Sequence, residues 1–244
     1  MTPDVGRRPD EGDGTGAQRE LIRPLLVPDD PQDAMTAYYA LSYDARRVRL
    51  TLHRSSVSEV DGFIAVCQTG RDLFVPLVVS RGSQQIVQGL MGGALRPGRF
   101  YTIIAKETLR AAVQEVVAVE WARTNLVYVL DPSSFRPVIN VMVQPGDDPF
   151  RFEIRVQDKA VSVAGVNWQS SRLAEMYVYT EPDSQGRGWG KAVGARCVQA
   201  LLEAHLLPLY IVSEDNLPSR DLAAVLGFRD SGAREFECQG QLRT

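Results

Sequence analysis

Short runs of apolar residues, broken by polar or turn-forming residues, recur along the chain and predict many strands. In the first half the runs are rich in Val, Ile and aromatic residues and are bounded by Gly, Asp, Arg or Pro, as strands are. These runs read VRLTLH, GFIAVCQ, LFVPLVVS, YTIIAK and LVYVLD. A helical spacing predicts helices in DPQDAMTAYYALSYDARRV, SQQIVQGLMGGAL and ETLRAAVQEVVAVEWA. The first half is therefore predicted to be α/β, with GLMGGALRPG as a helix end and turn.

The second half predicts an antiparallel meander followed by a strand–loop–helix–strand unit. Phe152, Ile154 and Val156 alternate with charged residues, which indicates a strand with one wet face. A break at Asp158-Lys159 predicts a hairpin. The predicted strands read VINVMVQ, RFEIRVQ, AVSVAGVNW, LAEMYVYT, LYIVSED and AREFECQ.

Two prolines and two serines in DPSSFRPV predict a domain boundary near Ser134 to Pro137. We therefore expect an N-terminal α/β domain over residues 21–136 and a second domain over residues 137–244. Residues 1–20 are rich in Pro, Gly and charge and predict a disordered tail.

Composition narrows the function classes. The net charge of the 244 residues is −3, which gives no general attraction to nucleic acid or to an anionic membrane. No run of 18 apolar residues predicts a membrane span. Three cysteines without a CxxC pair, and two histidines, disfavour a zinc site or a disulfide framework. We expect no metal and a reducing, cytoplasmic location.

One glycine-rich loop stands before a long predicted helix. Gly186, Gly188 and Gly190 alternate with Arg187 and Trp189. An apolar stripe then predicts a helix from about Gly188 to Leu206; its members are Trp189, Val193, Cys197, Ala200, Leu201 and Ala204. Free amides at a helix N-terminus, bare glycine backbone and the nearby cations of Arg187 and Lys191 together predict a phosphate or pyrophosphate site.

Two familiar nucleotide motifs do not fit this loop. A Walker A loop needs Ser or Thr after its Lys, whereas Ala192 follows Lys191. The Rossmann fingerprint GxGxxG appears only in a looser form, and the residues that follow the helix are too few for further βα units.

A third motif does fit. Gln185-Gly186-Arg187-Gly188-Trp189-Gly190 resembles the Q/R-x-x-G-x-G/A motif of the GNAT N-acetyltransferase superfamily, with Thr180 and Pro182 upstream. Further matches follow at Asn216, Ser219 and Gly227-Phe228, so that the resemblance covers about Phe152 to Glu237. The first half resembles the N-terminal halves of two-domain GNAT proteins, in which a degenerate copy has lost its CoA loop.

The resemblance implies an α/β (α+β) fold with a mixed, mostly antiparallel sheet that splays beside the motif strand and is flanked by helices. It implies acetyl-CoA as co-substrate, with its pyrophosphate on the amides of Gly186 to Lys191 and its pantetheine along the motif strand. The implied cofactor-binding residues are Tyr179, Thr180, Gln185, Gly186, Arg187, Gly188, Trp189, Gly190, Lys191, Asn216 and Ser219.

The resemblance also implies direct attack by an amine on the acetyl thioester, the acceptor being a small molecule or a peptide. Glu175 is the candidate base, with Glu214 and Asp215 in reserve. The family's usual acidic tyrosine is replaced by Ala223, so Tyr177, Tyr179 and Tyr210 are candidate substitutes. A CoA-binding sensor or scaffold without catalysis remains an alternative, as does a nucleotide-binding oxidoreductase. A homodimer is left open.

Overall fold

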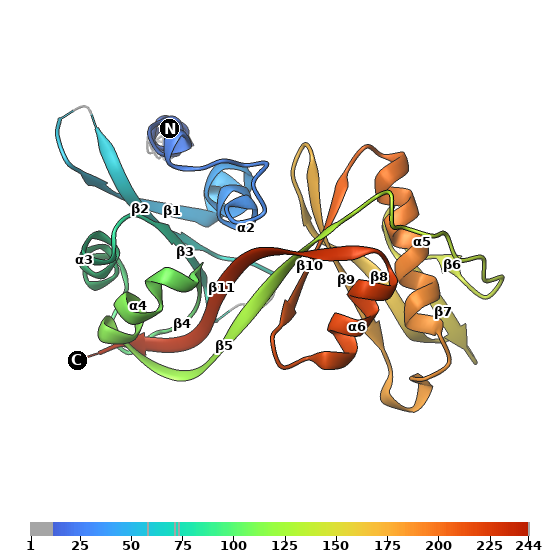
Figure 1. Ribbon diagram of the computed structural model, residues 1–244. Coiled ribbons are helices and arrows are strands. Elements are labelled where there is room, and N and C mark those ends of the chain that lie inside the picture. The colour runs from blue at the N-terminus through green and yellow to red at the C-terminus, as the bar shows by residue number, and fades with distance from the viewer. Residues whose placement is uncertain (1–11, 58, 71, 73, 244) are drawn as a thin grey trace, which may run out of the picture. The chain divides into compact units, whose positions relative to one another are not determined.

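The computed structural model describes residues 12–57, 59–70, 72 and 74–243. The chain divides into two compact units (Figure 1). The first unit comprises the chain up to Val27, Tyr39–Trp121 and the segment from Cys238 onward. The second unit comprises Pro28–Tyr38 and Ala122–Glu237. This division lies before the expected boundary at 136/137, because one strand, Val117–Leu130, continues from one unit into the other.

The first unit carries a sheet in which β1, β2 and β3 are antiparallel and β4 is parallel to β3. The C-terminal end of β11 and the start of β5 follow β4 in this sheet. Its elements are α1 (Gly12–Ile22), η1 (Arg23–Leu25), η3 (Ala45–Arg47), β1 (Val48–Arg54), β2 (Val60–Cys67), β3 (Leu77–Arg81), α3 (Gln84–Ala94), β4 (Phe100–Lys106), η4 (Glu107–Leu109) and α4 (Arg110–Val116). The short π-helix η2 (Tyr38–Ser42) begins at the last residue of the second unit's N-terminal segment.

The second unit has strand order β11-β5-β10-β9-β8-β7-β6. Strands β7, β8 and β9 form an antiparallel meander, and β10 is parallel to β9. Its elements are α2 (Ala34–Ala37), β5 (Val117–Leu130), β6 (Gln144–Pro145), β7 (Phe152–Val156), β8 (Lys159–Gln169), β9 (Leu173–Thr180), η5 (Pro182–Ser184), α5 (Trp189–Glu203), β10 (Leu207–Ser213), α6 (Leu217–Val225) and β11 (Phe228–Leu242). The mixed, mostly antiparallel sheet with flanking helices confirms the predicted fold class.

The two units repeat one order of elements. Each has three antiparallel strands, a helix, a strand parallel to the third, a second helix and a long final strand. In the first unit these are β1, β2, β3, α3, β4, α4 and β5; in the second they are β7, β8, β9, α5, β10, α6 and β11. The chain is therefore a structural duplication.

The predicted disordered tail needs correction over residues 12–20. Residues 1–11 lie outside the described residues, but Gly12–Ile22 form helix α1. Two tertiary interactions explain the order: the Arg19 guanidinium donates to the carbonyls of Ala40 (3.1 Å) and Tyr43 (2.5 Å), and Ile22 is fully buried. The polar local sequence could not predict these contacts, because their partners lie far along the chain.

Two further local predictions were wrong. The helix predicted over residues 107–122 ends at Val116, and β5 begins at Val117, because the β-branched residues Val117 and Val119 favour extended backbone. The strand predicted at VINVMVQ is a loop up to residue 143. There the Asn140 side chain accepts from the amide of Met142 at 2.9 Å, which closes a local turn.

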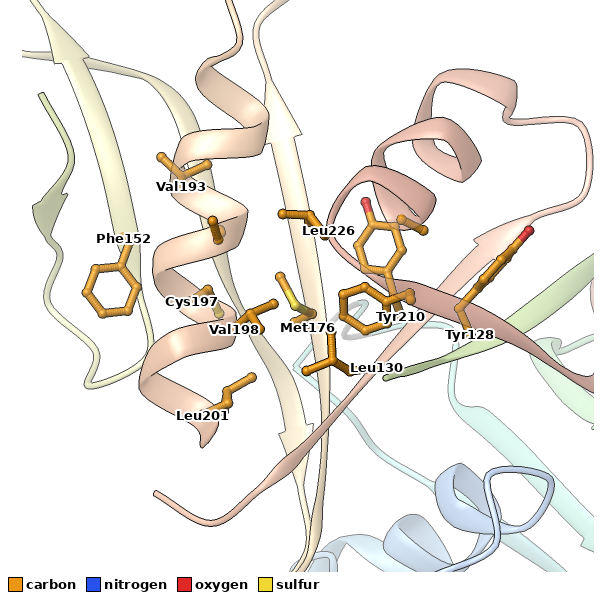
Figure 2. Packing of buried hydrophobic residues seen from close by; sticks show 14 of the residues in the cluster. Tyr128, Leu130, Phe152, Met176, Val193, Cys197, Val198, Leu201, Tyr210 and Leu226 are labelled. Carbon is orange, nitrogen blue, oxygen red and sulfur yellow. The ribbon is translucent and has the colours of Figure 1, made fainter. Parts of the chain in front are cut away.

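Helix α5 packs one face against strands β7, β8 and β9 of the second unit. Val193, Cys197 and Leu201 are fully buried on this face, which confirms these members of the predicted apolar stripe (Figure 2). Trp189 and Ala200 are partly buried, whereas Ala204 is exposed beyond the end of the helix. The helix ends at Glu203, three residues before the predicted end. His205 takes a left-handed φ of 59°, and Leu206 N donates to Leu201 O at 2.9 Å, which closes a Schellman motif.

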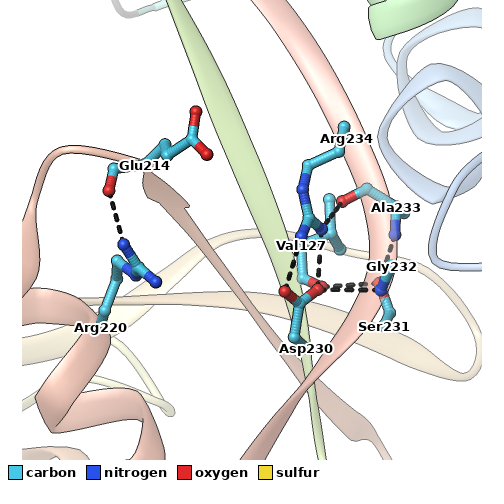
Figure 3. Close-up of polar contacts among 8 residues, drawn as sticks. All are labelled: Val127, Glu214, Arg220, Asp230, Ser231, Gly232, Ala233 and Arg234. Carbon is cyan, nitrogen blue, oxygen red and sulfur yellow. Dashed lines mark hydrogen bonds and ion pairs between the residues drawn. The ribbon is translucent and has the colours of Figure 1, made fainter.

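Polar contacts fix the last two elements of the second unit (Figure 3). Arg220 of α6 donates to the carbonyl of Glu214 at 2.9 Å and ties that helix to the end of β10. In β11, Asp230 accepts from Arg234 and from the amide of Gly232. Ser231 donates to Val127 O of β5 at 2.6 Å. No helix within the described residues is long and apolar enough to span a membrane.

Candidate functional site

Strands β9 and β10 separate partway along their length. Their parallel pairing runs from Leu173↔Leu207 to Met176↔Tyr210. Beyond that point β9 continues to Thr180 beside β8, and β10 continues to Ser213 beside β5. The last residues of β9 therefore present an edge that β10 does not cover, and this is the predicted splay.

The glycine loop follows the free end of β9. Gly186 and Gly188 have φ values of 75° and 74°, in the left-handed region that favours glycine. A Cβ at either position would meet nothing within 4 Å, so the space in front of the loop is open. Gln185 closes the loop by donating from Nε2 to Thr180 O at 3.2 Å.

The start of α5 presents unpaired amides to this space. Gly188 is the N-cap and offers no side chain to cap the helix. The first helical bond runs from Ala192 N to Gly188 O at 3.1 Å, so the amides of Trp189, Gly190 and Lys191 precede it. A Cβ at Gly190 would lie 3.1 Å from Oγ1 of Thr180, a tight contact that favours glycine there. Such a helix start attracts an anion.

A pocket of about 510 Å³ lies between this loop, the end of β9 and helix α6. All the predicted cofactor-binding residues except Arg187 line it. Instead of lining the pocket, the Arg187 guanidinium lies over the Trp189 ring, 5.0 Å from its centroid, and donates to Asp183 O at 3.4 Å. Lys191 is therefore the cation that the structure places in the pocket wall.

Asn216 and Ser219 belong to the α6 side of the pocket. Asn216 is the N-cap of α6, and its Oδ1 accepts from Ser219 N at 3.2 Å. Asn216 and Ser219, which the resemblance assigned to cofactor binding, thus also form the N-terminal cap of α6. The Ser219 hydroxyl is hydrogen-bonded to the Tyr210 hydroxyl at 2.9 Å. Burial raises the pKa of Tyr210, so this hydroxyl stays protonated at neutral pH.

Sequence reasoning missed the apolar part of the α6 wall. Pro218, Leu222 and Val225 line the pocket together with the carboxylate of Asp221. They recur at spacings of three and four residues and so share one face of α6, a signal that the sequence did contain.

Residues 117–228 match the family model described as Acetyltransferase (GNAT) family. Over this segment, which begins at the first residue of β5 and ends at the first residue of β11, the sequence is therefore similar to the GNAT family. No curated protein matches the sequence.

Solved structures share the fold over nearly the whole chain. A GCN5-related N-acetyltransferase from Sphaerobacter thermophilus has a TM-score of 0.64 at 12% identity and covers 100% of this chain and 98% of its own. A tandem GNAT protein from the clavulanic acid biosynthesis pathway has a TM-score of 0.62 at 13% identity, covering 94% and 96%. A GCN5-related N-acetyltransferase-like protein from Streptococcus suis has a TM-score of 0.60 at 14% identity, covering 94% and 100%. At these identities the likeness establishes the GNAT-like fold.

The three candidate catalytic residues share one face of β9. Met176, Val178 and Thr180 approach α5, so Glu175, Tyr177 and Tyr179 face the other way. Only Tyr179 among the three lines the pocket. Glu175 is buried and accepts from Asn167 at 3.1 Å.

Tyr177 lies against Gly165 of β8, where a Cβ would stand 2.7 Å from its hydroxyl. That hydroxyl accepts from Arg151 at 3.1 Å. The structure therefore holds Glu175 and Tyr177 in hydrogen bonds outside the pocket.

The reserve carboxylates Glu214 and Asp215 are exposed and do not line the pocket. Ala223 is fully buried in the core of the second unit. Gly227 has a φ of 91° and packs against the backbone of Phe135, and Phe228 packs against Tyr210. The Gly-Phe pair therefore has a structural role here.

The first unit has no equivalent glycine loop. Only Gly82 and Ser83 connect β3 to α3, whereas eight residues connect β9 to α5. The Ser83 hydroxyl accepts from Ile86 N at 3.4 Å and caps α3 itself. The helix start that would hold a pyrophosphate in a GNAT domain is thus occupied by a side chain.

Proposed function

We propose that the second unit binds acetyl-CoA and transfers its acetyl group to an amine acceptor. The observation that carries this proposal is the coincidence of three features in one pocket: the open edge of β9, the uncapped glycine start of α5 and the face of α6. The match of residues 117–228 to the GNAT family model supports it.

The residues present fit a CoA molecule. The amides of residues 186–191 would hold the pyrophosphate, and Lys191 adds positive charge. The uncovered edge at Tyr179 and Thr180 offers backbone groups to an extended amide chain, as a sheet edge does to a peptide. Bound acetyl-CoA would supply the activated acetyl thioester. The pocket's 510 Å³ lies within the usual range of small-molecule sites.

The acceptor amine is proposed to approach from the face of β9 that α5 does not cover. On that face Glu175 is the candidate base. Tyr177 is held in place by the hydrogen bond that its hydroxyl accepts from Arg151, and Tyr179 lines the pocket. On the α6 side, the Ser219 and Tyr210 hydroxyls stay protonated and can donate a hydrogen bond to a ligand. The acceptor is proposed to be a small molecule or a peptide.

A CoA-binding protein without catalysis is the second candidate. Ala223 stands where the family's usual tyrosine would be, and Glu175 and Tyr177 are engaged in hydrogen bonds outside the pocket. Both observations favour retention of the cofactor site with loss of the chemistry.

The two candidates separate in a turnover assay. Purified protein is incubated with acetyl-CoA and a panel of primary amines and peptides, and free CoA thiol and acetylated amine are quantified by mass spectrometry. Catalysis predicts acceptor-dependent acetylation that is reduced in Glu175→Gln. The matched control, Glu214→Gln, removes one exposed carboxylate outside the pocket and should leave the rate unchanged.

Acetyl-CoA binding without acetylation of any amine would favour the non-catalytic candidate. Failure to bind acetyl-CoA would overturn both. An equal loss of activity in Glu175→Gln and Glu214→Gln would remove Glu175 from the mechanism without affecting the cofactor site.

A further inference from the structure

A second pocket, of about 280 Å³, lies in the first unit, remote in sequence from the glycine loop. The register of the sheet places Val48, Cys67, Leu77 and Thr102 in one row. The pocket therefore opens where β1, β3 and β4 begin and β2 ends. Ser83 and the start of α3 follow the opposite end of β3. This pocket is thus distinct from the place where the first unit would carry a CoA loop.

Five arginines line this pocket: Arg46, Arg47, Arg49, Arg96 and Arg99. Among the described residues, the lining contains no Asp or Glu. Asp44 forms ion pairs with two of these arginines, at 3.0 Å from Arg46 and 4.0 Å from Arg47. Arg49 is held by a bond to Ala94 O at 2.6 Å. Arg46 and Arg47 are thus partly neutralised by Asp44, whereas the positive charges of the remaining arginines around the pocket would attract an anion.

Two of the arginines are presented by a tight turn. Arg96-Pro97-Gly98-Arg99 is closed by a bond from Arg99 N to Arg96 O at 3.3 Å, and Gly98 has a φ of 73°. Pro then Gly with a positive φ is the signature of a type II turn. Within the described residues, neither side chain forms an ion pair with a carboxylate. The glycine- and proline-rich stretch after α3 thus forms a turn that presents two arginines to the pocket.

The floor of the pocket adds a neutral donor. Tyr101 is buried, and its hydroxyl accepts from the backbone amide of Arg96 at 3.0 Å. A tyrosine hydroxyl that accepts one hydrogen bond can also donate one, so this hydroxyl can donate to a ligand in the pocket. The Arg99 guanidinium lies 5.8 Å from the centre of the Tyr101 ring, which places it above the same floor.

We propose that this pocket binds a small phosphorylated molecule, with its phosphate held by Arg96, Arg99 and the Tyr101 hydroxyl. Guanidinium groups pair with phosphate oxygens through parallel hydrogen bonds, which lysine cannot form. The pocket is too small for a whole dinucleotide and suits a phosphate on a compact metabolite. This site is independent of acetyl-CoA and of the proposed transfer reaction.

The test uses inorganic pyrophosphate as the probe, titrated calorimetrically into the full chain at constant ionic strength. The variant Arg96→Gln/Arg99→Gln removes two charges from the exposed turn. The matched control Arg23→Gln/Arg54→Gln removes two charges from the same unit outside the pocket. The Gly188→Glu variant blocks the glycine loop, which could itself bind pyrophosphate.

The proposal predicts saturable binding that Gly188→Glu and the control pair retain. Arg96→Gln/Arg99→Gln should weaken it at least about tenfold, because each charged hydrogen bond contributes that order of affinity. Binding that disappears in Gly188→Glu, or that falls equally in both arginine pairs, would overturn the proposal. So would tighter, turn-dependent binding of a single-stranded oligonucleotide than of pyrophosphate, because the partner would then be a nucleic acid.

Discussion

Gly188 is the position where the loop's backbone geometry can be tested apart from its ligand. Its φ of 74° is left-handed, and a Cβ there would meet nothing within 4 Å. Gly188→Ala should therefore lose stability through backbone strain alone. The expected loss is about 1–2 kcal/mol, the cost of the left-handed region for an L-residue. For a chain of this size that corresponds to a fall in Tm of roughly 2–8 °C.

Gly188→Asn is the matched control, because asparagine tolerates left-handed backbone better than alanine does. Its Tm should lie closer to that of the natural protein. Its side chain would still project into the open space before the loop, so acetyl-CoA should bind more weakly than to the natural protein. Thermal unfolding is followed by circular dichroism. The Tm is read from the transition that moves to higher temperature when acetyl-CoA is added. Equal Tm values for the natural protein and Gly188→Ala would refute the argument that glycine is needed here for its φ.

Three further outcomes follow from burial. Leu201 is fully buried against the second unit's core, so Leu201→Ala should lower the free energy of unfolding by about 2–5 kcal/mol in a urea titration, and a smaller loss would indicate that the core collapses around the gap. Burial raises the pKa of Cys67 and Cys197 to about 12, and Cys238 is buried too, so a thiol reagent at pH 8 should label these residues only after unfolding; rapid native labelling would contradict their placement. The raised pKa of Tyr210 contributes stability that is complete below the ordinary tyrosine pKa and is lost as pH rises through the folded pKa. Tyr210→Phe should therefore flatten the alkaline decline in the free energy of unfolding. An unchanged pH profile would exclude this contribution.

The glycine loop could be predicted because its signals are local. Alternating glycines, a helix start and an apolar stripe all lie within one stretch of sequence, and the structure shows the glycine loop before α5 and the buried middle of the stripe. The left-handed φ values of Gly186 and Gly188 came from the structure. The strands of both meanders were predictable for the same reason, since apolar runs in the first half and alternation in the second are properties of consecutive residues. The hairpin turn shifted by one residue: Gln157 and Asp158 take the positive φ values, and Val156 pairs with Lys159.

Long-range contacts decided what the sequence did not reveal. Helix α1 depends on bonds from Arg19 to residues about 20 positions away. The sequence placed Glu175 and Tyr177 on the motif strand, but their partners Asn167 and Arg151 come from β8 and from the chain before β7. Nothing in the local pattern shows which partner a strand residue will find.

The most direct test of the account is calorimetric titration of acetyl-CoA into the natural protein and into Gly188→Glu. The account predicts one site per chain in the natural protein. It predicts none in Gly188→Glu, whose carboxylate would meet the pyrophosphate at the helix start, while unfolding of this variant remains cooperative. No binding to the natural protein, or equal binding by a folded Gly188→Glu, would contradict the claim that the glycine loop of the second unit is a CoA site.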